Sequence, residues 1–105
     1  MDKPLDNDAI QVEVDIELAS VVPEFLDCRK NECALLERLL EKGAFKEIES
    51  LGHRLKGTGG SFGFAEISNI GESLEHAAVL SDRASVALAS RMLHRYLERV
   101  IVKYV

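Results

Sequence analysis

Apolar residues recur at helical spacing along most of the chain, and this periodicity constrains the fold more than any other feature. The clearest stripe follows intervals of three and four residues and contains Ile48, Leu51, Leu55, Thr58 and Phe62. Such spacing is typical of one buried face of an amphipathic helix. Similar stripes predict four helices: 24–42, 44–62, 65–80, and a fourth that Ser81 and Asp82 cap and that continues to the C-terminus.

Glycines mark where two of these helices end. Gly43 has the position of a C-terminal cap after the first helix. Gly63 ends the second helix and serves either the turn or close packing of the second helix on the third. Gly71 is expected to allow close packing of the third helix against its neighbours. Because the connections are short, neighbouring helices are expected to be antiparallel. The sequence predicts an all-α fold, an antiparallel up-down four-helix bundle with an N-terminal extension or short extra helix.

The N-terminal part alternates apolar and polar residues from Ile10 to Leu18, a pattern that by itself indicates a strand. A single strand has nothing to pair with in an otherwise helical chain, so an extended leader over 1–14 is expected instead. Asp15 would cap a following helix. Pro23 fits either the first turn of the next helix or a kink. We expect one domain over 1–105, with the helical bundle in 15–105.

Charge and hydropathy exclude several classes of protein. The formal net charge of -5 argues against a nucleic-acid-binding protein, which needs a basic face. No apolar run is long enough to span a membrane, and the N-terminus lacks the apolar core of a signal peptide. Cys28 and Cys33 would lie on different helix faces, which disfavours a disulfide between them. We expect a cytoplasmic protein with reduced cysteines, and a monomer because few large apolar residues face outward.

His53 is near the middle of the second predicted helix, roughly opposite its apolar stripe. Gly57 and Gly60, four and seven residues further on, share its side of the helix. A glycine inside a helix costs about 1 kcal/mol relative to alanine. Glycines around an exposed histidine therefore indicate a surface kept open for a group that approaches the ring, such as a partner's active site.

The run from His53 to Gly63 resembles the signature of histidine-containing phosphotransfer (HPt) domains of two-component phosphorelays. That signature has a lysine three residues after the histidine, a glycine four after it and another ten after it, matched here by Lys56, Gly57 and Gly63. The similarity continues through 64–75, which is similar to the family's next helix. Many members carry two small hydroxyl residues where this chain has Gly59 and its neighbours, a change expected to loosen the helix locally.

The resemblance implies a role for each matching residue. His53 would accept and donate the phosphoryl group, and Lys56 would offer a cation to its oxygens. Gly57 and Gly60 would keep the surface flat for an approaching receiver domain. Phe64 is expected near the same side, where it would add an apolar docking contact.

The resemblance also implies the partner. It is a receiver domain of a response regulator or hybrid histidine kinase, whose aspartate gives or takes the phosphoryl group. The receiver brings Mg²⁺ and most catalytic groups, so no cofactor and no metal are expected on this chain. Arg54 would either meet an acidic receiver surface or be merely solvated.

Other interpretations of these residues are weaker. The glycines do not fit a P-loop, because Lys56 precedes them, and no histidine pair has the spacing of helical zinc enzymes. His76 and His94 are expected to be surface residues. Arg29 and Glu32 lie near the apolar stripe of the first helix. They are expected either to be solvated at its flank or to form an ion pair one turn apart. The chain has no room for an ATP-binding module, so no autokinase activity is expected. The alternative function is a non-catalytic adaptor with the HPt fold that binds a partner without phosphoryl transfer.

Overall fold

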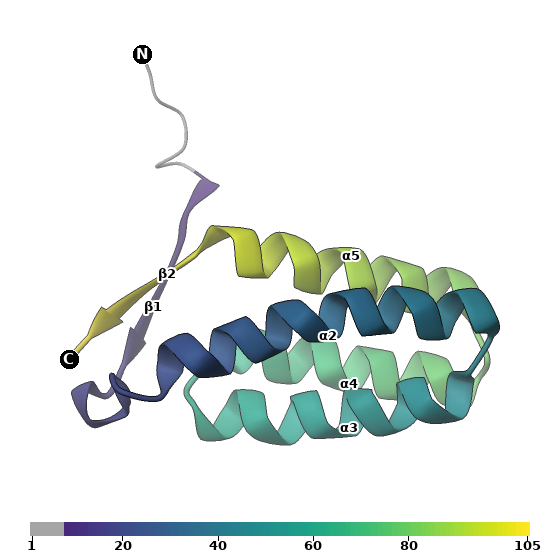
Figure 1. The fold of residues 1–105 in the computed structure, drawn as a ribbon, viewed down its shortest axis with the longest axis horizontal. Coiled ribbons are helices and arrows are strands. Elements are labelled where there is room, and N and C mark those ends of the chain that lie inside the picture. Colours follow the sequence, from purple (N-terminus) through teal and green to yellow (C-terminus); the bar gives the residue numbers. More distant parts are fainter. Residues whose placement is uncertain (1–7) are drawn as a thin grey trace, which may run out of the picture.

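The computed structural model describes residues 8–105, which form four α-helices and one small sheet (Figure 1). The helices are α2 (Val22–Lys42), α3 (Phe45–Ser61), α4 (Ala65–Val79) and α5 (Arg83–Arg99). They run alternately up and down along the long direction of the molecule, with the sheet at one end (Figure 1). The predicted antiparallel four-helix bundle is confirmed.

The predicted helix ends are also confirmed. Gly43 adopts φ 69° and donates its N–H to the carbonyls that close α2, while Gly63 has φ 87° in the turn between α3 and α4. Both conformations favour glycine because a Cβ would be strained there. Asp82 caps α5 by accepting a hydrogen bond from the Ser85 amide at 3.1 Å. Pro23 lies in the first turn of α2, where its missing N–H costs nothing.

The two chain ends differ from the sequence prediction. The strand β1 (Ile10–Val14) pairs in parallel with β2 (Val100–Tyr104), in the register Ile10↔Val100. The extended leader was therefore wrong for this segment, and so was the continuation of the last helix to the C-terminus. The alternating pattern at the N-terminus had a partner after all, a second β-branched segment some ninety residues away. The first seven residues of the predicted leader are outside the described part of the chain.

A short 3-10 helix, η1 (Ile16–Leu18), connects the sheet to α2. The Asp15 carboxylate accepts a hydrogen bond from the Glu17 amide at 2.8 Å, so the predicted cap is confirmed on a shorter helix than expected.

The apolar stripes form one core along the bundle axis. Ile48, Leu51 and Leu55 of α3 are at most 1% exposed, whereas Thr58 and Phe62 at the end of the stripe are half-buried. Side chains from all four helices complete this core, among them Phe25, Leu36, Phe64, Ile67, Leu74, Val86 and Leu93.

The α3 and α4 helices have the most extensive contact of any pair in the described structure. Three glycines permit it, since a Cβ on Gly52, Gly59 or Gly71 would come within 2.5–2.7 Å of a backbone nitrogen of the opposite helix. Gly59 was expected to loosen α3 locally. That expectation was wrong, because α3 stays helical through this position and the missing side chain is what lets the two backbones meet.

Candidate functional site

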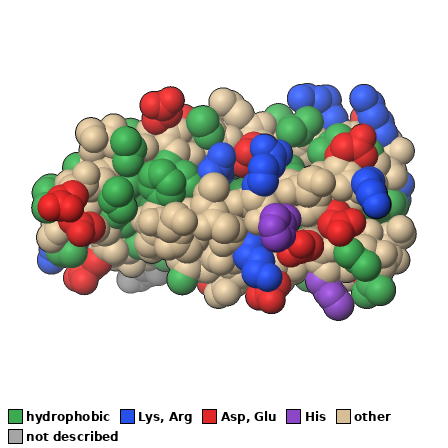
Figure 2. Space-filling model, turned by 90° about the horizontal axis from the view of Figure 1, so that it is seen from below, with side chains coloured by type: hydrophobic (Ala, Val, Ile, Leu, Met, Phe, Trp, Pro, Cys, Tyr) green, Lys and Arg blue, Asp and Glu red, His purple; other side chains and the backbone are tan. Residues whose placement is uncertain are grey.

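His53 lies on the outer face of α3, and 72% of its side chain is exposed. Ile48, Leu51 and Leu55 point into the core, so the helical geometry sends the imidazole outward as predicted. Figure 2 shows the face nearest α3, where histidine, acidic and basic side chains lie close together beside a broad area of backbone and small or polar side chains. The ring is therefore open to a partner.

A carboxylate on the neighbouring helix holds the imidazole. The Nδ1 atom of His53 lies 3.0 Å from Oε2 of Glu75 in α4, and 26% of the Glu75 side chain is exposed. A carboxylate acceptor at Nδ1 favours the tautomer that carries its proton there. The Nε2 atom of a neutral ring is then unprotonated and has a lone pair available for attack.

Close backbone packing explains why Glu75 reaches the ring. Gly52 precedes the histidine, and a Cβ at this glycine would lie 2.7 Å from the backbone nitrogen of Glu75. The absence of a side chain there brings α4 against α3 at the height of His53. Sequence reasoning missed Glu75 as a site residue, because no spacing along the chain indicates a pairing across two helices.

Lys56 lies one turn after the histidine and is also at the surface. Its Nζ atom is 3.8 Å from Oε2 of Glu72, and the two side chains are 46% and 66% exposed. An exposed pair at this distance is weak. The ammonium group can therefore exchange this contact for an incoming anion at small cost.

Gly57 and Gly60 extend the exposed surface beyond the histidine. A Cβ at Gly57 would meet nothing within 4 Å, and one at Gly60 would only touch the Ser68 hydroxyl at 4.0 Å. Neither glycine is thus required for packing inside this chain, unlike the intervening Gly59. The surface they leave matches the open area inferred from the sequence.

Phe64 was wrongly placed at the docking surface. It is fully buried and its ring stacks on Phe25 with centroids 5.5 Å apart. The turn at Gly63 directs the chain inward, so that the residue before α4 enters the core. Phe62, which also stacks on Phe25 at 4.3 Å, is the half-buried aromatic side chain at this end of α3.

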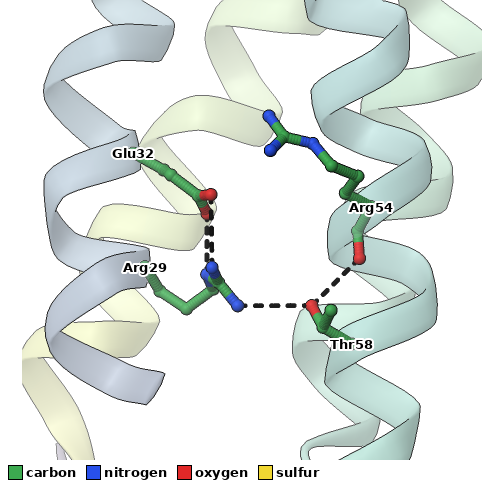
Figure 3. Close-up of polar contacts among 4 residues, drawn as sticks. All are labelled: Arg29, Glu32, Arg54 and Thr58. Carbon is green, nitrogen blue, oxygen red and sulfur yellow. Dashed lines mark hydrogen bonds and ion pairs between the residues drawn. The ribbon is translucent and has the colours of Figure 1, made fainter. Parts of the chain in front are cut away.

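Arg54 is exposed, and its side chain extends from α3 toward α2 (Figure 3). Its backbone carbonyl accepts a hydrogen bond from the Thr58 hydroxyl at 2.9 Å, and that hydroxyl oxygen accepts one from Arg29 at 3.3 Å. Arg29 also donates two hydrogen bonds to Glu32, at 2.6 and 3.2 Å. The predicted one-turn ion pair is confirmed, and it is half-buried between α2 and α3 (Figure 3).

The remaining polar candidates lie apart from His53. His76 is exposed, and His94 pairs with Glu98 in the next turn of α5 at 3.3 Å. Cys28 is exposed and Cys33 is buried, and neither forms a disulfide. Within residues 8–105 no three side chains are grouped as a metal site, and no helix is long and apolar enough to cross a membrane.

Comparison with known proteins identifies one family. A family model described as Hpt domain matches residues 21–101. Searches of curated proteins and of solved structures give no match. The matched range includes all four helices but only the first two residues of β2.

Proposed function

The chain belongs to the Hpt family, and from this membership we propose that it is a phosphorelay intermediate that carries a phosphoryl group on His53. The group would come from the aspartyl phosphate of one receiver domain and pass to the aspartate of another. One observation carries the proposal. The only histidine of α3 is exposed, and the Glu75 carboxylate lies 3.0 Å from its Nδ1, which leaves Nε2 as the ring nitrogen without a partner in residues 8–105.

The transfer requires few groups from this chain. The Nε2 lone pair attacks phosphorus in line with the aspartyl oxygen, the P–O bond breaks, and the receiver's carboxylate leaves. The Nδ1 proton remains on the ring, and the adjacent Glu75 carboxylate stabilises the positive charge that the imidazole gains. In the reverse step the second receiver's carboxylate oxygen attacks phosphorus and the N–P bond breaks.

Lys56 and the glycine surface would assist this transfer. The Lys56 ammonium is one helical turn from the acceptor and would neutralise phosphoryl oxygens as they approach. Gly57 and Gly60 would let the receiver's loops reach the ring. Mg²⁺ would be bound by the receiver, and the protein would act as a carrier without kinase activity of its own.

Phosphoryl transfer from a labelled receiver tests the proposal. The wild-type chain and His53→Gln are incubated in parallel with several phosphorylated receiver domains. The proposal expects acid-labile, base-stable labelling of the wild type and none of His53→Gln. His76→Gln is the matched control, because it removes an exposed histidine of α4 and should leave labelling unchanged.

Two results would contradict the proposal. Acid-labile labelling that persists in His53→Gln would assign the phosphoryl group to another residue. Absence of labelling with every receiver, together with retained receiver binding, would favour the non-catalytic adaptor. Circular dichroism of each variant establishes that the helices are intact.

A further inference from the structure

A groove lies on the part of the molecule formed by β1, the start of α4 and the end of α5. Its volume is about 710 Å³, within the usual range of ligand-binding clefts. Its lining includes Ile70 and Met92 together with Arg95 and Arg99. None of the residues around the histidine, such as Glu75, lines it. The groove is thus separate from the phosphotransfer surface.

The groove runs along the edge of β1 that pairs with no other strand in residues 8–105. Four consecutive residues of this strand, 10–13, line it. Because successive side chains of a strand point to opposite faces, a run of four lining residues is expected where a groove follows the strand's edge. The opposite edge of β1 is occupied by β2.

The hydrogen-bond pattern shows which backbone groups are at that edge. Val105 donates its N–H to the carbonyl of Val14 at 2.9 Å, so the backbone groups of Val14 point toward β2. Backbone groups alternate along a strand. Those of Gln11 and Glu13 therefore point away from β2, toward the groove. An edge with unpaired N–H and C=O groups is a template for another strand.

The walls of the groove favour a particular kind of occupant. Arg95 and Arg99 follow one another at one-turn spacing on α5 and give that wall two positive charges, while Glu66 and Glu13 are the acidic residues of the lining. Tyr96, between the arginines, is only 4% exposed. Burial and the nearby Glu66 raise the pKa of Tyr96 to about 12.

We propose that this groove binds an extended peptide segment of a partner protein, which adds a strand to the edge of β1. The segment would carry acidic side chains on the face turned toward α5, to meet its two arginines, and apolar β-branched side chains on the opposite face. Backbone hydrogen bonds to Gln11 and Glu13 would supply much of the affinity, as in other strand-addition complexes. At about 3.3 Å per residue, the lined part of β1 holds roughly four residues of such a peptide.

The direct test is a titration of the ¹⁵N-labelled chain with a capped peptide of alternating valine and glutamate. The proposal expects saturable shifts of the Gln11 and Glu13 amide resonances. A matched peptide with lysine in place of glutamate should bind at least about fivefold more weakly. Arg95→Ala should remove most of this difference. Arg91→Ala, an exposed arginine of α5 outside the groove, should not.

A pair of variants at one position separates the backbone from the side chain. Glu13→Pro removes an N–H that points away from β2, a change that edge strands tolerate, and it should abolish binding. Glu13→Ala keeps the N–H and should bind at least as well as the wild type. Phosphoryl labelling of His53 and the circular dichroism spectrum report whether each variant is folded.

Several outcomes would overturn the proposal. Absence of saturable shifts, or equal binding by Glu13→Pro and Glu13→Ala, would exclude strand addition at this edge. Shifts confined to β2 would place the peptide elsewhere. A sedimentation coefficient that rises with protein concentration, and does so only when Glu13 is not proline, would assign the edge to a second copy of this chain.

Discussion

The Nδ1 atom of His53 and the Oε2 atom of Glu75 lie 3.0 Å apart across the contact between α3 and α4. The ring is mostly exposed and the carboxylate is mostly buried. A mostly buried carboxylate on one helix therefore orients an exposed imidazole on the other. The two glycines at this height, Gly52 and Gly71, bring the backbones close enough for the contact to form.

The first prediction concerns this contact. Glu75→Ala removes the acceptor at Nδ1, so the neutral imidazole should become a mixture of both tautomers. The ¹⁵N shifts of the ring measure that mixture. We expect single-turnover phosphoryl transfer from a receiver to slow by about tenfold, because fewer rings are correctly oriented with Nε2 unprotonated.

Glu72→Ala is the control for this prediction. It removes a carboxylate of the same helix that faces Lys56 and not the imidazole. The tautomer should stay as in the wild type. If Glu72→Ala and Glu75→Ala changed the ring shifts equally, a general electrostatic effect of α4 would replace the specific role of Glu75.

The second prediction compares two neighbouring glycines. Gly59→Ala places a Cβ 2.6 Å from the Ser68 backbone nitrogen, which forces the helices apart and should lower the free energy of unfolding by about 1–3 kcal/mol. Gly57→Ala meets nothing within 4 Å and should raise it by up to about 1 kcal/mol, the gain in helix propensity. Urea unfolding of both variants measures the difference. Equal stabilities would show that the two helix backbones can separate without cost.

Local patterns predicted the four helices, their glycine and aspartate ends, and the exposure of His53. Each of these depends on residues within a few positions of one another, such as Asp82 and Ser85 in the cap of α5. The pairing of β1 with β2 was not predictable in this way. It joins segments at opposite ends of the chain: the first has a strand pattern without a nearby partner, and the second resembles a continuation of the last helix.

The same distinction applies within the site. His53, Lys56 and Gly57 follow from spacing along one helix, whereas Glu75 depends on how α4 is rotated against α3. The burial of Phe64 depends on the turn at Gly63, whose positive φ directs the chain inward. A periodicity argument extended through that turn places Phe64 on the wrong side.

The third prediction concerns the half-buried ion pair between Arg29 and Glu32 (Figure 3). Arg29→Met leaves the Glu32 carboxylate with less compensation and removes the contact to Thr58. It should lower the free energy of unfolding by about 1–2 kcal/mol. A double-mutant cycle with Glu32→Gln should give a coupling energy of about 1 kcal/mol. A cycle that combines Arg29→Met with Glu37→Gln should give no coupling energy, because Glu37 is exposed and does not contact Arg29.

The fourth prediction concerns the two thiols. Burial, together with Glu37 and Glu32, raises the pKa of Cys33 from 9.0 to about 11, whereas Cys28 is exposed. A thiol reagent at pH 8 should therefore modify Cys28 rapidly, and Cys33 only after unfolding. Cys28→Ser identifies the fast reaction. Rapid modification of a second thiol in the folded protein would contradict the burial of Cys33.

The same shift gives the sign of a pH effect on stability. The unfolded chain loses the Cys33 proton near pH 9 and the folded chain only near pH 11, so deprotonation favours the unfolded state between these values. The stability of the wild type relative to Cys33→Ala should hence be constant below pH 8 and decline from about pH 9 toward pH 11. Urea unfolding of both proteins across this range measures the difference, in which the other titrating groups cancel. A difference that does not change with pH would mean that the folded protein ionises Cys33 as easily as the unfolded chain does.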